Sequence, residues 1–328
     1  MKHATIQTPS NILNYLKKKN MRDVRHELLT GLTTKPKYIS PKYFYDEKGS
    51  ALFEQITSLP EYYPTRTEKQ ILSNVVSQLD FDFTNATIVE LGSGDASKIS
   101  LIFNQLTDET LAGLTYFPVD ISYSAIQQSI TGLSCNFKLK SITGLVLDFN
   151  TQLHLIPKKP KRLFLFLGST IGNFDETERD RFLKNLYNEM QPGDYLLLGL
   201  DRVKETAVLE KAYNDSKGVT ERFNKNIMQV MNGILDTNFI PDDFAHKAFF
   251  NSELNRIEMH LVARKNIQIT IDKGINISLK QGESIHTENS YKFTDKDIEN
   301  MTQNSQLKIK QVFSDDKNWF SIIFFEKN

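Results

Sequence analysis

The chain has 328 residues, with 40 lysines and arginines balanced by 40 aspartates and glutamates. A neutral chain lacks the excess positive charge that binding by counterion release requires, so a nucleic-acid partner is not expected. No run of about 18 apolar residues is present, which argues against a membrane-spanning helix. The length suggests about two domains of ~150 residues each.

Cysteine and histidine usage narrows the class of protein further. The single cysteine, Cys135, excludes an intrachain disulfide framework and fits a reducing compartment. Residues 1–5 carry no apolar signal core, so we expect a cytoplasmic protein, and we expect it to be a monomer. None of the six histidines pairs with another, or with the cysteine, at metal-ligand spacing, so no metal site is predicted.

The elements expected along the chain begin with an irregular N-terminal part. Residues 1–65 combine helix-like patterns with a dense aromatic segment that prolines interrupt, which predicts loops or short helices. From residue 66 the pattern becomes an alternation of strands and helices. The expected strands are 87–91, 115–119, 144–147, 163–167 and 195–200, and the expected helices are 97–106, 122–130 and 177–190. Nearly continuous apolar strands that alternate with helices predict a parallel sheet covered on both faces.

The remaining third of the chain departs from this alternation. Helices are expected at 205–215 and 219–235, followed by strands at 256–263 and 267–271. Two final strands, 307–313 and 319–325, flank a polar turn and predict an antiparallel closing pair. The predicted fold is therefore α/β, with a Rossmann-like sheet of parallel strands and an antiparallel closing pair, plus a second α+β lobe. Residues 66–202 and 293–328 would form the cofactor-binding domain, and residues 1–65 and 203–292 the substrate-binding lobe.

The most informative stretch is residues 88–95 (IVELGSGD), where an apolar run ends in two glycines. Gly92 and Gly94 would let the backbone approach a nucleoside, because they carry no Cβ. Asp120 follows the next apolar run, where an acid can accept hydrogen bonds from two ribose hydroxyls. Ser97 stands where the dinucleotide fingerprint needs a third small residue close to the helix. A nucleoside cofactor is therefore predicted, and a nicotinamide-dependent oxidoreductase stays as a less favoured alternative.

Several longer motifs resemble one enzyme family. They are residues 41–46 (PKYFYD), 59–68 (LPEYYPTRTE), 90–94 (ELGSG), 166–173 (FLGSTIGN) and 218–220 (GVT). Together they resemble the S-adenosylmethionine-dependent L-histidine Nα-methyltransferases of the ergothioneine pathway, from about residue 22 to the C-terminus. The resemblance implies that L-histidine is methylated on its α-amino group, in three successive steps, to give hercynine.

The resemblance also implies roles for individual residues. The residues implied to bind S-adenosylmethionine are Gly92, Lys98, Asp120, Asp148 and Phe149. Those implied to bind the amino acid are Tyr62, Gly168, Asn173, Tyr213, Met259, Glu288 and Ser290. Tyr45, Asn173 and Tyr213 are implied to act at the reacting centre. No metal is implied.

The chemistry of these side chains suits such a substrate. Asn173 and Tyr213 are neutral donors for a carboxylate, whereas a cation there would repel the sulfonium of the cofactor. Glu288 can accept an imidazole N–H, with Ser290 as a second partner. Taken singly, each residue has an ordinary structural explanation: Tyr62 as a core aromatic, Lys98 as a surface lysine. The alternatives that stay open are methylation of a tryptophan derivative and a non-catalytic protein that binds S-adenosylmethionine.

Overall fold

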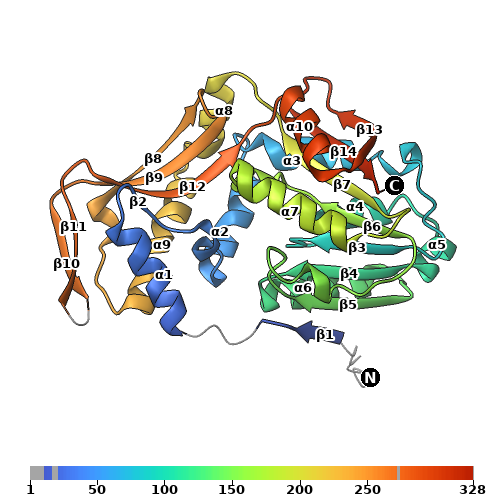
Figure 1. Cartoon of the computed structure of the whole chain (residues 1–328), viewed down its shortest axis with the longest axis horizontal. Coiled ribbons are helices and arrows are strands. Elements are labelled where there is room, and N and C mark those ends of the chain that lie inside the picture. Colours follow the sequence, from blue (N-terminus) through green and yellow to red (C-terminus); the bar gives the residue numbers. More distant parts are fainter. Residues whose placement is uncertain (1–10, 17–20, 272–273, 328) are drawn as a thin grey trace, which may run out of the picture.

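The computed structural model describes residues 11–16, 21–271 and 274–327, which form two lobes side by side along the longest axis (Figure 1). Residues 1–5, on which the expectation of no signal sequence depends, lie outside this part. Within the described residues, no helix is long and apolar enough to span a membrane.

The larger lobe is built on an eight-stranded sheet with the order β1-β5-β4-β3-β6-β7-β14-β13. Neighbouring strands from β1 to β7 are parallel, and β14 and β13 close the sheet antiparallel to their neighbours. This order confirms the predicted Rossmann-like sheet with an antiparallel closing pair. The strands are β1 (Asn11–Asn14), β3 (Thr87–Leu91), β4 (Thr115–Asp120), β5 (Ser141–Val146), β6 (Arg162–Phe166), β7 (Tyr195–Asp201), β13 (Lys308–Ser314) and β14 (Phe320–Glu326).

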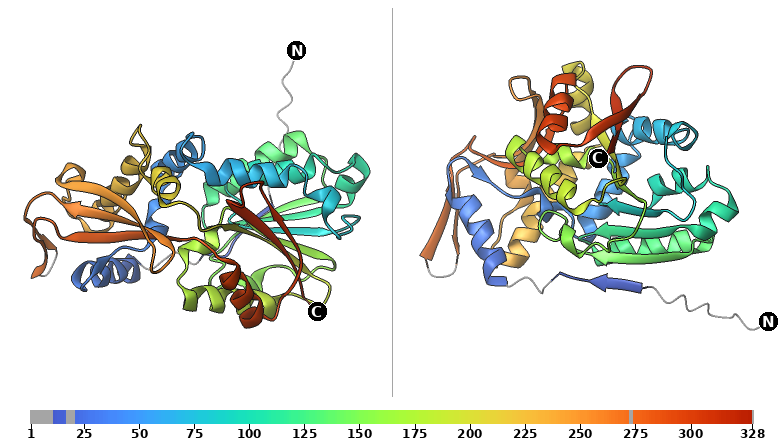
Figure 2. Two further views of the ribbon diagram at one scale, coloured as in Figure 1. Left: turned by 90° about the horizontal axis from the view of Figure 1, so that it is seen from above. Right: turned by 45° about the vertical axis from the view of Figure 1, so that its right-hand side comes forward.

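Helices cover both faces of this sheet, as Figure 2 shows from two further directions. The central strands β3 and β6 are buried at every position, which accounts for their lack of polar alternation. One apolar core joins the sheet to α7 (Glu176–Glu189) and α10 (Asp295–Ser305). The other joins it to α3 (Tyr63–Leu72), α4 (Ser97–Phe103), α5 (Asp108–Gly113) and α6 (Tyr123–Asn136).

The smaller lobe has its own sheet and its own core. Its four-stranded sheet has the order β2 (Lys37–Tyr38), β12 (Ser284–Tyr291), β9 (Arg256–Ala263) and β8 (Phe244–Asn251). A β-hairpin of β10 (Ile267–Ile271) and β11 (Ile275–Leu279) extends from it. The helices are α1 (Met21–Thr33), α2 (Glu47–Thr57), α8 (Thr206–Tyr213) and α9 (Val219–Leu235). In α9, Phe223, Ile227 and Met231 recur every fourth residue and enter this core.

Five short 3-10 helices complete the described part of the chain. They are η1 (Pro41–Phe44), η2 (Val76–Gln78), η3 (Leu153–Leu155), η4 (Thr170–Asn173) and η5 (Pro241–Asp243). Of these, η4 matters most for the site, because it follows β6 at the carboxyl edge of the sheet.

The predicted division into lobes needs correction at the N-terminal side. Strand β1 does not join the smaller lobe but pairs in parallel with β5 in the larger sheet. The predicted boundary after residue 65 also falls inside α3, which begins at Tyr63. Pro64 lies in the first turn of this helix, where proline is tolerated. In the sequence the same proline predicts an interruption, and this misplaced the boundary.

Candidate active site

The turn after β3 provides an open backbone surface at the carboxyl edge of the sheet. Gly92 and Gly94 adopt φ values of +72° and +53°, which side chains rarely tolerate. A Cβ added to either glycine would have no heavy atom within 4 Å, so both face free space. The Gly92 N–H donates to the Val119 carbonyl at 2.8 Å, and this bond fixes the turn against β4.

Asp120 lies at the end of β4 and closes the same turn. Its Oδ2 accepts from the Gly94 N–H at 3.3 Å, and its Oδ1 accepts from the Ser122 N–H at 2.9 Å. Burial raises the pKa of this carboxyl, although the backbone donors oppose that effect. The Leu147 N–H donates to the Asp120 carbonyl at 3.1 Å, which brings the end of β5 beside it.

The next two predicted cofactor residues follow β5 directly. Asp148 Oδ1 accepts from the Asn150 N–H at 3.0 Å and so caps the turn. Phe149 makes edge-on ring contacts with Phe166 on β6 and Phe182 on α7, with ring centroids 5.4 and 5.9 Å apart. These packed rings hold the loop after β5 against β6 and α7.

A buried carboxylate, Glu68 of α3, organises the loop after β6. Lys98 Nζ lies 2.8 Å from Glu68 Oε2, and the Gly168 N–H donates to Glu68 Oε1 at 2.6 Å. A Cβ at Gly168 would come 2.7 Å from Lys98 Nζ, and a Cβ at Gly199 only 2.3 Å from Glu68 Oε1. A side chain at either position would therefore crowd this ion pair.

The loop after β6 also contacts the smaller lobe. Gly168 and Ser169 both have positive φ values, +78° and +53°, and the sharp turn leads into η4. A Cβ at Gly172 would lie 2.9 Å from the Tyr291 carbonyl, so η4 packs directly on β12. The side-chain amide of Asn173, at the end of η4, forms no hydrogen bond with any residue that the structure describes. It is therefore free to bind a ligand near β12.

Four of the predicted substrate residues line one pocket in the smaller lobe. Tyr62, Tyr213, Met259 and Glu288 surround it, together with residues that the sequence analysis missed: Phe53, Ile56, Ala212, Thr220 and Phe223. The Tyr62 and Tyr213 rings contact each other at 6.1 Å between centroids. Burial raises the pKa of both phenols, so both are protonated hydrogen-bond donors near neutral pH.

Tyr45 lies beside this pocket rather than deep within it. Its ring packs edge-on against Phe53 and Phe223, with centroids 5.8 and 6.0 Å away, and 36% of its surface is exposed. Burial of the phenol, and then the charge of Glu288, raises its pKa; Asp120 adds a smaller contribution. Tyr45 therefore lies within the electrostatic reach of both the pocket and the cofactor edge.

A β-bulge directs Glu288 into the pocket. The register between β12 and β9 shifts between His286 and Glu288, so Thr287 and Glu288 both face inward although they are consecutive. The Glu288 carboxylate accepts no hydrogen bond from the described residues. Burial raises its pKa to about 7, and the charge of Lys292 only partly offsets this effect. An acceptor without a donor is thus held in a partly desolvated pocket.

A buried network of hydrogen bonds and ion pairs adjoins the pocket, and it was not predicted from the sequence. Lys292 Nζ donates to Ser290 Oγ at 2.8 Å and to the Tyr213 hydroxyl at 3.1 Å, and pairs with Asp201 at 2.8 Å. The Tyr213 hydroxyl also lies 2.8 Å from Ser290 Oγ. Lys292 is only 2% exposed, so its charge needs these partners.

Asp201 anchors the other side of the same network. Its carboxylate accepts from the Tyr63 hydroxyl at 2.8 Å and pairs with Lys204 at 2.5 Å. Burial alone would raise its pKa, but Lys292 and Lys204 outweigh burial and lower it. Two signals in the sequence could have revealed these residues. Asp201 is the last residue of an apolar strand, and Lys292 lies two residues after Ser290, on the same face of an extended segment.

The structure thus collects the predicted residues into two neighbouring groups. The first group surrounds the carboxyl edge of the larger sheet: Gly92, Lys98, Asp120, Asp148 and Phe149, together with Gly168, which was predicted to bind the amino acid. The second surrounds the pocket of the smaller lobe: Tyr45, Tyr62, Tyr213, Met259, Glu288 and Ser290. Asn173 lies at the contact of η4 with β12, between the two groups. This arrangement suits a transfer between a bound nucleoside and a small polar molecule.

Comparison with known proteins decides the family. The family model described as "Histidine-specific methyltransferase, SAM-dependent" matches residues 24–327. The chain belongs to this family. The histidine N-alpha-methyltransferase of Mycolicibacterium smegmatis is 39% identical over 290 residues, covering 88% of this chain and 90% of that protein. That of Mycobacterium tuberculosis is 40% identical over 272 residues, covering 82% and 84%.

A solved structure supports the fold of this histidine-specific methyltransferase family member. The mitomycin 7-O-methyltransferase MmcR superposes with a TM-score of 0.50 at 12% identity, over 94% of this chain and 69% of that one. The donor that the family uses, S-adenosylmethionine, fits the residues at the sheet edge. Gly92 and Gly94 leave space beside the backbone, and the Asp120 carboxylate lies at the strand end where a ribose is held in such sheets.

Proposed function

We propose that this chain methylates the α-amino group of L-histidine with S-adenosylmethionine, three times in succession, to give hercynine for ergothioneine biosynthesis. The observation that carries the proposal is the adjacency of Glu288 and Ser290 on β12. Both side chains face the Tyr213 side of the smaller lobe, and η4 with Asn173 packs on the same strand. One small zwitterion can therefore reach an acceptor, hydroxyl donors and an amide.

Neutral donors serve the substrate carboxylate in this proposal. The Asn173 amide has no partner among the described residues, and the Tyr213 phenol is protonated because burial raises its pKa. A fixed cation at this place would repel the positive sulfonium of the donor. Lys292 does carry a charge nearby, and Asp201 offsets only part of it, because the same carboxylate also pairs with Lys204.

Lys292 would also set which way the two hydroxyls point. An ammonium group has three N–H donors and no acceptor, so Ser290 Oγ and the Tyr213 oxygen must each accept from it. The Tyr213 O–H is directed to Ser290 Oγ, so the Ser290 O–H is the one that remains available to the substrate. Ser290 can then donate to the bare nitrogen of a neutral imidazole while Glu288 accepts the N–H at the other nitrogen.

The methyl transfer depends mainly on the alignment of the α-amino nitrogen with the methyl group of the donor. S-adenosylmethionine supplies an already activated methyl group, and the α-amino nitrogen needs only to lose its proton. The side chains of the pocket position that nitrogen and exclude water, and such alignment can contribute on the order of 7–11 kcal/mol. Tyr45 and Tyr213 stay protonated at neutral pH, so they orient the substrate rather than remove its proton.

A tryptophan derivative is the alternative substrate on the same chemistry. Its indole carries one N–H and no second ring nitrogen, so the Ser290 hydroxyl would be left without a ligand partner. Leaving a buried polar group unpaired costs about 1–3 kcal/mol. In a mixture of equal concentrations of histidine and tryptophan, histidine should therefore receive most of the methyl groups. Equal incorporation of methyl groups into both amino acids, measured by mass spectrometry, would overturn the assignment of histidine.

A further inference from the structure

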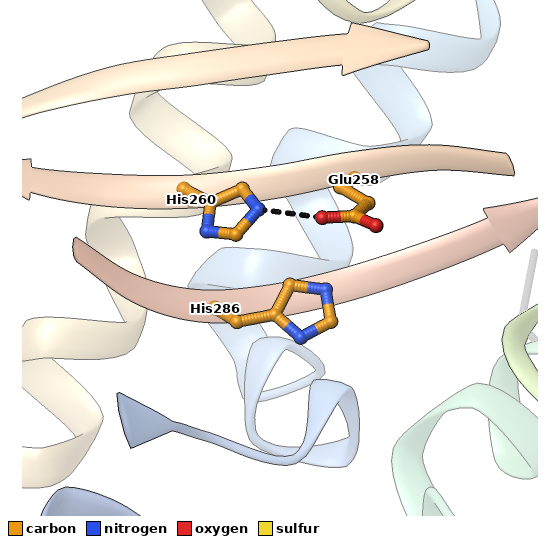
Figure 3. A group of neighbouring side chains, drawn as sticks. All are labelled: Glu258, His260 and His286. Atoms are coloured by element: carbon orange, nitrogen blue, oxygen red, sulfur yellow. Dashed lines mark hydrogen bonds and ion pairs between the residues drawn. The ribbon is translucent and has the colours of Figure 1, made fainter. Parts of the chain in front are cut away.

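A cluster of two imidazoles and one carboxylate lies on the outer face of the small sheet, away from the pocket. Glu258 and His260 are two residues apart on β9, so they share one face, and His286 on β12 is the direct cross-strand partner of His260. The His260 and His286 ring centroids are 4.8 Å apart (Figure 3). Sequence spacing could not reveal this group, because the two histidines meet only through strand pairing.

The geometry points to a Zn²⁺ site formed by Glu258, His260 and His286, with water as a fourth ligand. One ligand atom from each residue lies within 4.8 Å of the other two. A tetrahedral ion with ligands at about 2.1 Å holds them about 3.4 Å apart, so small side-chain rotations would complete the site. Two imidazole nitrogens and one carboxylate oxygen form a ligand set that suits zinc.

Surrounding residues already orient the carboxylate for this role. Glu258 Oε1 accepts from Arg256 Nε at 2.9 Å and from Asn251 Nδ2 at 3.0 Å, whereas Oε2 faces His260 Nε2 at 3.0 Å. Oε2 is thus the oxygen available to an ion, and Arg256 and Asn251 would support the ligand from behind, as outer partners of metal ligands do. The His260 and Glu258 side chains are 15% and 10% exposed, which leaves an entry path.

The site would tie together two strands that carry substrate residues on their other face. Met259 lies between Glu258 and His260, and His286 Nε2 lies 3.0 Å from the carbonyl oxygen of Glu288. An ion bridging β9 and β12 would therefore restrain the bulge that directs Glu288. This inference concerns metal binding and stability, and it stands whether or not histidine is the substrate.

Calorimetric titration of the chelator-treated full chain with ZnCl₂ tests the inference, and Co²⁺ absorption reports the ligand geometry. We expect about one equivalent of Zn²⁺ and a raised unfolding temperature, since an ion that binds only the folded state stabilises it. His260→Phe and His286→Phe, which keep a ring in place, should each weaken binding at least tenfold, and Glu258→Gln likewise. His26→Ala, an exposed histidine on α1, is the matched control. No binding by the wild type, or unchanged binding by the His260→Phe/His286→Phe double variant, would overturn the site.

Discussion

Replacing Glu288 by glutamine should make the enzyme more stable and less able to use histidine. Burial raises the pKa of Glu288 from 4.5 to about 7 in the folded protein. The folded state therefore binds this proton more tightly than the unfolded chain, so stability falls as the pH rises from about 4.5 to 7. This change in pKa corresponds to an upper limit of about 3.4 kcal/mol above pH 7. Glutamine has no charge to desolvate, so the variant escapes this loss.

Chemical denaturation of both proteins at pH 5 and at pH 8.5 measures the effect. We expect similar stabilities at pH 5 and a variant that is about 2–3 kcal/mol more stable at pH 8.5, allowing for solvent near the pocket mouth. Glu253→Gln, in the exposed turn between β8 and β9, is the control and should show no such pH-dependent gain. Histidine affinity should fall at least tenfold in Glu288→Gln while S-adenosylmethionine binding persists. An equal stability difference at both pH values would refute the reasoning about burial.

Three further outcomes follow from the site. Lys292→Met should raise the KM for histidine at least tenfold and leave the affinity for the cofactor unchanged. Lys204→Met is the control and should leave the KM unchanged, because Lys204 also pairs with Asp201 but contacts neither Tyr213 nor Ser290. An equal rise in KM in both variants would contradict the role of Lys292 in orienting the hydroxyls. Gly92→Ala should weaken the binding of S-adenosylmethionine tenfold or more, as measured by calorimetry. Gly193→Ala, at a similar φ of +82° in a distant turn, is the control and should only destabilise the fold through backbone strain of about 1–3 kcal/mol. Equal cofactor affinities of the two variants would reject the role of the glycine turn. The kcat/KM for histidine should rise with pH through about 7, as Glu288 and the substrate amine lose protons, and a profile flat from pH 6 to 9 would contradict this.

The larger sheet could be predicted from the sequence because its signals are local. Buried parallel strands such as β3 read as continuous apolar runs, and the glycine turn and Asp120 directly follow two of them. The predicted strand 144–147 was shifted relative to β5, which begins at Ser141, because the first residues of β5 are partly exposed and polar. Strand β1 was missed since four residues flanked by polar chain give almost no periodic signal.

The pocket was harder to predict, because its residues come from distant segments and a local irregularity aims them. Alternation along β12 correctly pairs Glu288 with Ser290 on one face, yet only the bulge turns Thr287 inward as well. Lys292 and Asp201 lie far apart in sequence, and their ion pair depends on the meeting of β7 with the end of β12. The order of strands and the register between them carry that information, and neither can be derived from residue patterns alone.

The central claim is that the residues at the sheet edge and in the pocket of the smaller lobe bind histidine with its α-amino nitrogen directed toward the methyl donor. The most direct measurement incubates the purified chain with S-adenosylmethionine bearing a labelled methyl group and all twenty amino acids, and identifies the products by mass spectrometry. The account predicts label on histidine alone, rising to three methyl groups on the α-nitrogen. Label on the imidazole ring, label on another amino acid, or a product that stops at one methyl group would contradict it.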